Sequence, residues 1–167
     1  MAGVSTKDIK NRIRSMESTK QITKAMEMVA ASKLRHAQAQ VLSSRPYFEI
    51  LRGTITDIVN SNTDFSSPYL TQRPVKKTAY VVIAGDRGLA GGYNSNVLKL
   101  LLEHMQGKEA VVLPVGRKGA DYCKAHNIPT LTEVDTHAED VSVGDCFSAA
   151  KQLCKRYCKG EFDRVYV

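Results

Sequence analysis

The feature that most constrains this chain is its first third, a stretch from Thr6 to Asn60 whose only glycine is Gly53 and whose only proline is Pro46. Residues of high helix propensity dominate the stretch. Ser5 or Thr6 is suited to cap its start, and Asp8 would follow in the first turn. A helix of about 50 residues would reach roughly 75 Å, which is far longer than a small domain needs.

Within this stretch, apolar residues follow the four-three spacing of a coiled-coil seam. The centre of the seam is weak because Lys20, Thr23 and Glu27 occupy it. We expect Pro46 to bend or interrupt the helix near Arg45. A helix with so narrow an apolar stripe is not stable alone, so we expect it to need a partner helix. The large apolar residues of the seam are Ile9, Ile13, Met16, Leu34, Val41, Phe48, Leu51, Ile55 and Ile58.

The positive charge of the chain is concentrated in the same stretch. The net charge of the whole chain is +7. Up to Arg52 there are ten Lys or Arg residues and four Asp or Glu residues, a net charge of +6, so the rest of the chain carries only +1. A basic helix indicates an acidic partner, either a protein surface, a nucleic acid or an anionic lipid. The basic residues are spread around the helix and few aromatic residues accompany them, which favours a protein over a nucleic acid.

Beyond the helix, the sequence changes in character. Residues 61–74 are rich in Asn, Ser and Pro and are interpreted as a linker. Short β-rich runs then alternate with helical segments, which is typical of a parallel sheet covered on both faces. We predict an α/β fold with a long coiled-coil helix over 1–60 and a small Rossmann-like domain over 75–167. The predicted strands are 78–84, 110–115, 128–134 and 163–167, and the predicted helices are 94–106, 117–126 and 141–159, the last capped by Asp140 or Ser142.

The two ends of the chain also carry information. No apolar run approaches the roughly 20 residues needed to span a bilayer. The first ten residues lack the apolar stretch of a signal peptide. These patterns predict a cytoplasmic protein that is soluble or peripheral to the membrane. The last residues, 164–167, belong to a predicted buried strand with no polar tail, so we expect the Rossmann-like domain to be incomplete and the full protein to continue.

The glycine-rich loop Gly85–Gly92 follows the first predicted strand and precedes a predicted helix. In doubly wound folds this edge of the sheet often binds ligands. The loop matches neither the dinucleotide-binding spacing of glycines nor the phosphate-binding loop that ends in Gly-Lys. A structural turn, or a loop offered to a protein partner, is therefore favoured. A nucleotide-binding Rossmann protein with a helical oligomerisation arm remains the alternative.

The reactive side chains form no recognisable active site, and we predict no catalytic residue, no bound cofactor and no metal. No serine lies in a nucleophile-elbow pattern. The acidic loop with Asp135, Glu139 and Asp140 is interpreted as a solvated turn. The cysteines are expected to be free thiols, and the spacing of the last two is that of neighbours on one helix face. The cysteines are Cys123, Cys146, Cys154 and Cys158.

Four segments resemble the gamma subunits of F-type ATP synthases. The most specific is Gln21–Leu34, with the sequence QITKAMEMVAASKL. The segments Ile9–Ile13 and Ser44–Tyr47 resemble the same family, as does the loop Asp86–Asn94. The resemblance extends over nearly the whole chain.

The resemblance implies a non-catalytic rotor. In this family a second long helix, from the C-terminal end of the chain, winds around the first, and the pair stands inside the hexamer of alpha and beta subunits. The Rossmann-like domain meets the epsilon subunit and the c-ring at the cytoplasmic face of a bacterial membrane. Ion flow turns the c-ring and this shaft, and the shaft changes the nucleotide affinity of each beta subunit. Residue by residue, the resemblance implies contacts with the beta subunits for Lys24, Met26, Lys33, Asp86, Arg87 and Gly88.

Without the second helix, the seam of the first helix would be left uncovered. We therefore expect this chain either to self-associate through its N-terminal helix or to lose the order of that helix.

Overall fold

The computed structural model describes residues 5–61, 67–71, 73–131, 137–139 and 141–167. The chain divides into two compact units, Met1–Phe65 and Ser66–Val167. The first unit contains the helix α1, and the second contains a parallel sheet with its covering helices.

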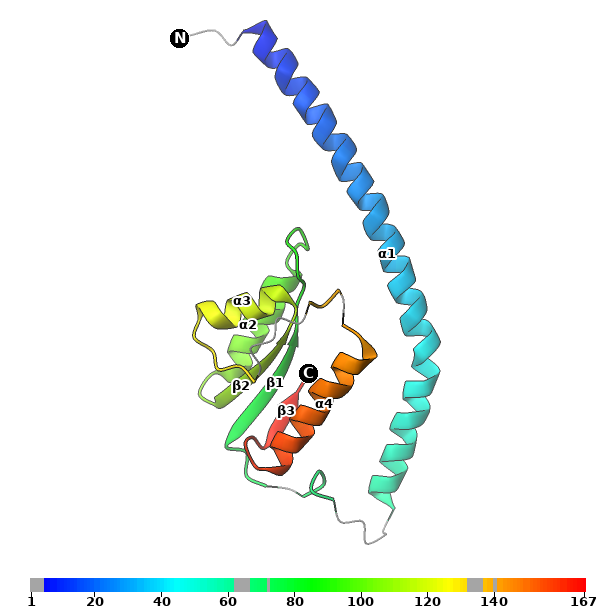
Figure 1. Ribbon diagram of the computed structural model, residues 1–167, viewed down its shortest axis with the longest axis vertical. Helices are drawn as coiled ribbons and strands as arrows, with labels where there is room; N and C mark the ends of the chain where they lie inside the picture. The colour runs from blue at the N-terminus through cyan, green and yellow to red at the C-terminus, as the bar shows by residue number, and fades with distance from the viewer. Residues whose placement is uncertain (1–4, 62–66, 72, 132–136, 140) are drawn as a thin grey trace. The chain divides into compact units, whose positions relative to one another are not determined.

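The first unit is built on one helix, α1, which runs from Thr6 to Asn60 over 55 residues (Figure 1). Ser5 caps its start, because the Ser5 side chain accepts a hydrogen bond from the Lys7 backbone N–H at 3.3 Å. The predicted long helix is thus confirmed. Among the residues of α1 none is buried, so its large apolar side chains are exposed along its whole length.

Of the two effects predicted for Pro46, a bend or an interruption, the interruption does not occur, because α1 is continuous through Pro46. Figure 1 shows a single helix that curves gently. Proline has no N–H group, so the Leu42 carbonyl four residues earlier loses its helical partner. Close to that carbonyl, the Ser44 hydroxyl donates a hydrogen bond to the Val41 carbonyl at 3.1 Å. One missing hydrogen bond in so long a helix disturbs the ladder locally without ending it.

The second unit contains a parallel sheet whose described strands lie in the order β2-β1-β3. The strands are β1 (Lys77–Ile83), β2 (Glu109–Val115) and β3 (Arg164–Tyr166). Lys77 pairs with Glu109 on one side of β1, and Thr78 pairs with Arg164 on the other. The central strand β1 is largely buried, which explains its continuous run of apolar residues. This arrangement confirms the predicted α/β fold with a parallel sheet.

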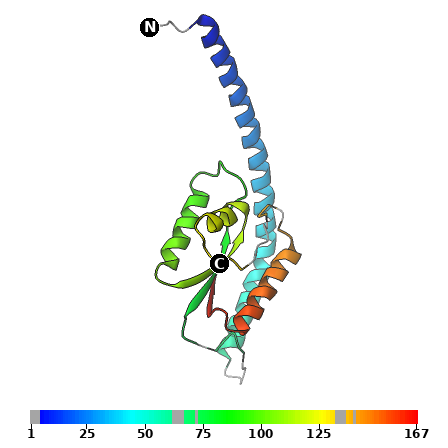
Figure 2. The same ribbon diagram turned by 60° about the vertical axis from the view of Figure 1, so that its left-hand side comes forward.

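Helices cover both faces of the sheet (Figures 1 and 2). The helices α2 (Tyr93–Met105) and α3 (Arg117–Ala125) pack on one face, and α4 (Val143–Cys158) packs on the other. The first face buries Tyr80, Val82, Leu98, Leu101, Val112 and Cys123. The second face buries Ala79, Val111, Leu113, Leu131 and Phe162.

The predicted strand 128–134 is not confirmed over its described part. Residues 128–131 form only an isolated parallel bridge between Thr130 and Val112, and residues 132–134 lie outside the described residues. Pro129 has no N–H to donate to a ladder. The N–H of Ile128 instead donates to the Cys123 carbonyl and closes the end of α3.

The N-terminus of α4 is capped by Ser142, one of the two predicted caps. The Ser142 hydroxyl accepts from the Asp145 N–H, and the Asp145 carboxylate accepts from the Ser142 N–H, which is a capping box. The other candidate, Asp140, lies outside the described residues, as do residues 62–66 and 72 of the predicted linker.

Arg73, in the segment before β1, binds residues at the end of α4 and in the turn that leads to β3. The Arg73 Nε lies 3.0 Å from the Asp163 Oδ1, an ion pair in which the N–H is not aimed as in a hydrogen bond. The Arg73 guanidinium stacks over the Tyr157 ring at 4.1 Å and donates to the Phe162 carbonyl at 2.6 Å. The Asp163 carboxylate in turn accepts from the Lys76 N–H at 2.9 Å. These contacts hold β1 beside β3.

Within the part of the chain that the structure describes, no helix combines the length and the apolar character that crossing a bilayer requires.

Candidate functional site

The six residues singled out from the sequence fall into two sets, one in each unit. Lys24, Met26 and Lys33 lie on α1 and are exposed. Successive residues of a helix turn by roughly 100° about its axis. Met26 and Lys33, seven residues apart, therefore share a face of α1, whereas Lys24 lies on the opposite side. These three exposed side chains therefore lie on two separate faces of α1.

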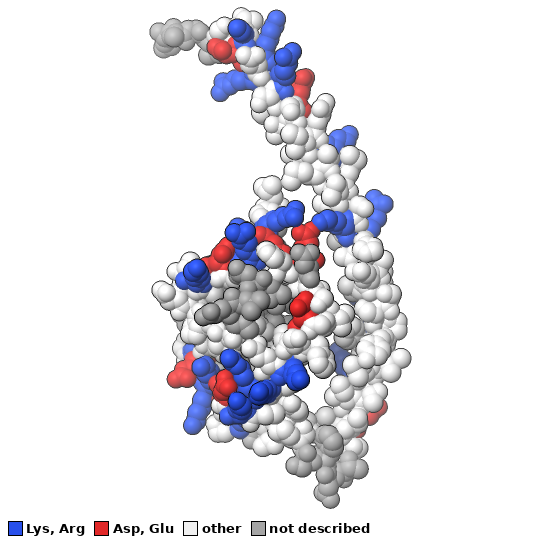
Figure 3. Space-filling model, viewed as in Figure 1, with Lys and Arg blue, Asp and Glu red and all other residues white. Residues whose placement is uncertain are grey.

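The face of α1 that carries Met26 is apolar near its middle. Ile22 and Val29 lie one turn away on either side of Met26, and all three are more than half exposed. Beyond this patch, basic side chains surround the N-terminal part of α1. In the view of Figure 3, Lys and Arg atoms gather toward the amino end of α1 and thin out toward its carboxyl end. The surface of α1 thus offers both apolar and positively charged contacts.

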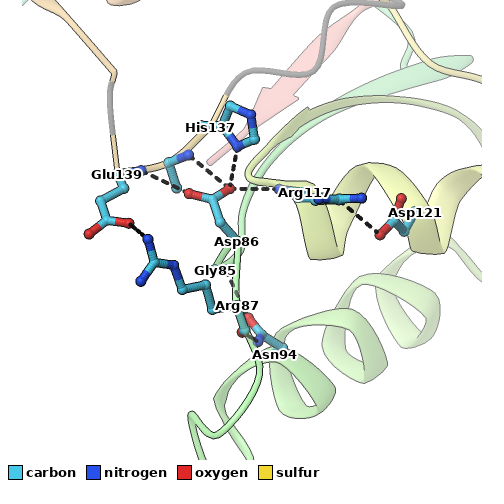
Figure 4. A network of polar contacts seen from close by, with 9 residues as sticks. Gly85, Asp86, Arg87, Asn94, Arg117, Asp121, His137 and Glu139 are labelled. Atoms are coloured by element: carbon cyan, nitrogen blue, oxygen red, sulfur yellow. Dashed lines mark hydrogen bonds and ion pairs between the residues drawn. The ribbon is translucent and has the colours of Figure 1, made fainter. Parts of the chain in front are cut away.

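The second set lies in the loop after β1, where Asp86 is the centre of a polar network (Figure 4). The Asp86 Oδ1 accepts from the backbone N–H of Arg117 at 2.9 Å and from that of Ala138 at 3.1 Å. The Asp86 Oδ2 accepts from the Glu139 N–H at 3.0 Å. The Nδ1 of His137 lies 3.7 Å from the Asp86 Oδ1. The carboxylate is thus surrounded by donors from this unit and its side chain is only 11% exposed.

This environment stabilises the charged form of Asp86. Backbone hydrogen bonds lower the pKa of Asp86 from 3.8 to about 2. The bond from the Arg117 N–H at the start of α3 has the largest effect, and the bond from the Glu139 N–H has the next largest. The amino end of a helix carries a partial positive charge, which favours a carboxylate there. The structure therefore gives Asp86 a role in closing the loop against α3.

Two further contacts fix the loop. The Asn94 Oδ1, at the start of α2, accepts from the Gly85 N–H at 2.8 Å. The Gly85 carbonyl accepts from the Lys118 N–H of α3 at 3.0 Å. Gly116, which precedes α3, has a φ of +93°, and a Cβ there would lie 1.9 Å from the Ala84 carbonyl oxygen. Only glycine permits this close approach of the end of β1 to the start of α3.

Arg87 and Gly88 lead from this anchored base to an exposed tip. The Arg87 guanidinium is 82% exposed and pairs with the Glu139 carboxylate at 3.3 Å. Beyond Gly88, the side chain of Leu89 is 95% exposed and its φ is +61°. The loop therefore presents a guanidinium and a leucine on a rigid base. Leu89 is not among the six residues singled out from the sequence, although it lies within the loop motif Asp86–Asn94.

Comparisons with known proteins agree with this architecture. A family model described as "ATP synthase" matches residues 5–167. The chain belongs to the ATP synthase family. A relative named "ATP synthase gamma chain" from Alkaliphilus metalliredigens is 42% identical over 99% of this chain and 57% of its own length. Relatives with the same name from Heliobacterium modesticaldum and Desulfitobacterium hafniense are 42% and 38% identical, over 95% and 98% of this chain and 55% and 59% of their own lengths.

The chain thus spans a little more than half the length of the gamma chains it matches. The matched part includes α1 and the loop after β1, where both sets of predicted contact residues lie. The resemblance of the sequence to ATP synthase gamma subunits is confirmed.

The described residues contain no group of three or more His, Cys, Asp or Glu side chains arranged to hold a metal ion. Of the predicted acidic loop, Asp135 and Asp140 lie outside the described residues, whereas Glu139 pairs with Arg87.

Proposed function

We propose that this chain acts as part of the central rotor of an ATP synthase and that it has no catalytic site of its own. The observation that supports this most strongly is α1, a 55-residue helix with no buried residue. A helix that its own unit does not cover is suited to be enclosed by other subunits. Membership of the ATP synthase family, with relatives named gamma chain, supports the other subunits of that complex as the enclosing partners.

The alpha and beta subunits are the proposed partners of α1. Lys24 lies on the side of α1 opposite to Met26 and Lys33, so a flat partner surface would meet only one of these sets. A ring of subunits around the helix meets both sets at once. Acidic surfaces on the beta subunits would complement the net charge of +6 up to Arg52.

In the loop after β1, we propose a division of labour. Arg87 and the tip at Gly88 reach a beta subunit, while Asp86 holds the base of the loop through its bonds to Arg117 and Glu139. Rotation of the asymmetric surface would stabilise a different conformation of each beta subunit in turn. The epsilon subunit and the c-ring complete the proposed partners, and an ion gradient at the cytoplasmic face of a bacterial membrane would drive the motion.

The test is assembly with alpha and beta subunits. The purified chain is mixed with them at low salt and analysed by size-exclusion chromatography. We expect a complex that weakens as salt is added. The double variant Lys24→Glu/Lys33→Glu is expected to bind at least tenfold more weakly, whereas Lys99→Glu/Lys124→Glu, with the same charge change in the second unit, serves as the control. Elution of the unmodified chain apart from the other subunits at low salt would contradict the proposal.

The alternative, a nucleotide-binding enzyme, is disfavoured by Asp86. Its carboxylate, charged at neutral pH, lies at the edge of the sheet where a Rossmann protein would bind anionic phosphates. We expect the purified chain not to hydrolyse ATP. ATP turnover that persists through purification and disappears in Arg87→Ala would support the enzyme instead.

A further inference from the structure

Two thiols lie side by side on the surface of α4. Cys154 and Cys158 are both exposed and unoxidised, and both belong to α4. Residues four apart on a helix have Cβ atoms about 5–6 Å apart on the same face. The side chains that face the sheet are instead Ala149, Leu153 and Tyr157. The two thiols are therefore not needed for the core.

A tyrosine from a distant part of the chain packs against the same end of α4. Tyr69 lies in the turn before β1, and its ring stacks on the ring of Tyr157 with centroids 5.9 Å apart. Because Tyr157 directly precedes Cys158 in α4, this stacking places the Tyr69 ring beside the carboxyl end of α4. Figures 1 and 2 show the turn that carries Tyr69 beside the carboxyl end of α4.

The distance between the two thiols determines whether a disulfide or a bound metal ion can link them. A disulfide needs Cβ atoms about 3.5–4.5 Å apart, so α4 would have to distort to form one. An ion bound linearly between two thiolates separates the sulfur atoms by roughly 4.5 Å, twice a metal–sulfur bond of about 2.3 Å. Rotation about the cysteine side-chain bonds reaches this distance from Cβ atoms on an undistorted helix.

We propose that Cys154 and Cys158 form a two-thiolate site for a soft, linearly coordinated cation, with monovalent copper as its best match. Soft thiolate ligands favour monovalent copper, zinc and iron–sulfur clusters over harder ions. Zinc requires about four ligands, and the described residues offer no group of three or more metal-binding side chains. This site is independent of the proposed rotor function.

Basic residues surround the two cysteines and affect the charge balance of a complex between copper and two thiolates. Two thiols and one monovalent cation give a complex of net charge −1 and two released protons, so both sulfur–hydrogen bonds break as two sulfur–metal bonds form. Lys151, Lys155 and Lys159 lie on α4 or at its C-terminal cap, within one turn of a cysteine. Their positive charges stabilise the anionic complex once it has formed, although they oppose the approach of the free cation.

The test is titration of the chain with monovalent copper under anaerobic, reducing conditions against a coloured copper chelator. We expect one copper ion per chain. Cys154→Ser and Cys158→Ser are each expected to lower the affinity at least tenfold. Cys146→Ser is the matched control, because Cys146 is an exposed cysteine two turns away on the same helix, and it should bind as the unmodified chain does. Circular dichroism confirms that each variant is folded.

Four results would overturn the proposal. The first is unchanged copper affinity in Cys154→Ser or Cys158→Ser. The second is an equal loss in Cys146→Ser. The third is one copper ion per two chains together with a doubled mass in light scattering, since the ion would then join separate molecules. The fourth is zinc binding as tight as copper binding, since this would require ligands beyond the two thiolates.

Discussion

The Asp86 carboxylate accepts a hydrogen bond from the backbone N–H of Arg117 at 2.9 Å. Through this bond, the loop after the central strand closes the amino end of α3, a helix that follows the neighbouring strand. The same carboxylate also binds the N–H groups of Ala138 and Glu139. The Asp86 side chain thus links its own loop to the start of α3 and to the segment of Ala138 and Glu139, all at the carboxyl edge of the sheet.

This arrangement makes the stability of the second unit depend on pH. The pKa of Asp86 is lowered from 3.8 to about 2 in the folded chain. Its contribution is therefore fully present above about pH 4 and is lost as the pH falls from about 4 to about 2. We expect Asp86→Asn to lower the urea midpoint at about pH 6, and the difference from the unmodified chain to vanish by about pH 2. Asp121→Asn, which removes an exposed pair at 3.9 Å, should show little effect at either pH.

Replacement of Gly116 by alanine should destabilise the second unit strongly. The new Cβ would meet the Ala84 carbonyl oxygen at 1.9 Å, and the φ of +93° is unfavourable for any other residue. We expect a loss of more than about 2 kcal/mol in urea unfolding. Gly107→Ala is the control, because Gly107 also has a positive φ, +71°, but nothing lies within 4 Å of the added atom. That control should cost only about 1 kcal/mol.

In an assembled ATP synthase, Met26→Lys should impair coupling more than ATP hydrolysis. Methionine adapts to several neighbours without a strong preference, whereas a lysine would form ion pairs with acidic beta surfaces in only some rotary positions. The measurement is the number of protons pumped per ATP hydrolysed. Met28→Lys makes the same change on the other side of α1, where the side chain is 62% exposed. Equal loss of coupling in both variants, or none in Met26→Lys, would show that this face of α1 is not the relevant one.

The uncovered seam of α1 predicts self-association or loss of helical order. Each large side chain left exposed forfeits about 1.5–3 kcal/mol, against a total stability of roughly 5–15 kcal/mol. Because Lys20, Thr23 and Glu27 weaken the centre, we expect pairing between positions 41 and 58. Light scattering and circular dichroism at low micromolar concentration test this.

A pair of neighbouring residues distinguishes the seam from the rest of α1. Leu51→Asp should abolish any self-association because Leu51 lies on the seam, whereas Ile50→Asp, off the seam, should not. A monomer with a fully formed helix would contradict the expectation.

The elements with strong periodicity were predictable from the sequence. The helix α1 follows from a long stretch of good helix formers with a single glycine and a single proline, β1 from its apolar β-rich run, and Ser142 marks the start of α4 by its side-chain chemistry. The failure at residues 128–131 also has a local cause. Their apolar character resembles a strand, but Pro129 cannot donate to a ladder and the N–H of Ile128 is used by α3.

The network around Asp86 could not be predicted in the same way. Asp86 itself belongs to a recognisable motif, but its partners are backbone N–H groups of Arg117, Ala138 and Glu139. Every residue except proline has such a group, so the sequence carries no sign of which ones will be used. The contact of His137 with Asp86 likewise arises only from the fold.

The uninterrupted passage of α1 through Pro46 has a mechanical consequence. A helix resists bending and twisting through its ladder of backbone hydrogen bonds, and Pro46 removes one of them where the Leu42 carbonyl would be bound. We therefore expect the stiffness of α1 to be lowest near residue 46, although the helix remains unbroken. A load applied to the two ends of α1 is expected to concentrate its strain at this point, as at an elastic joint between two stiffer segments.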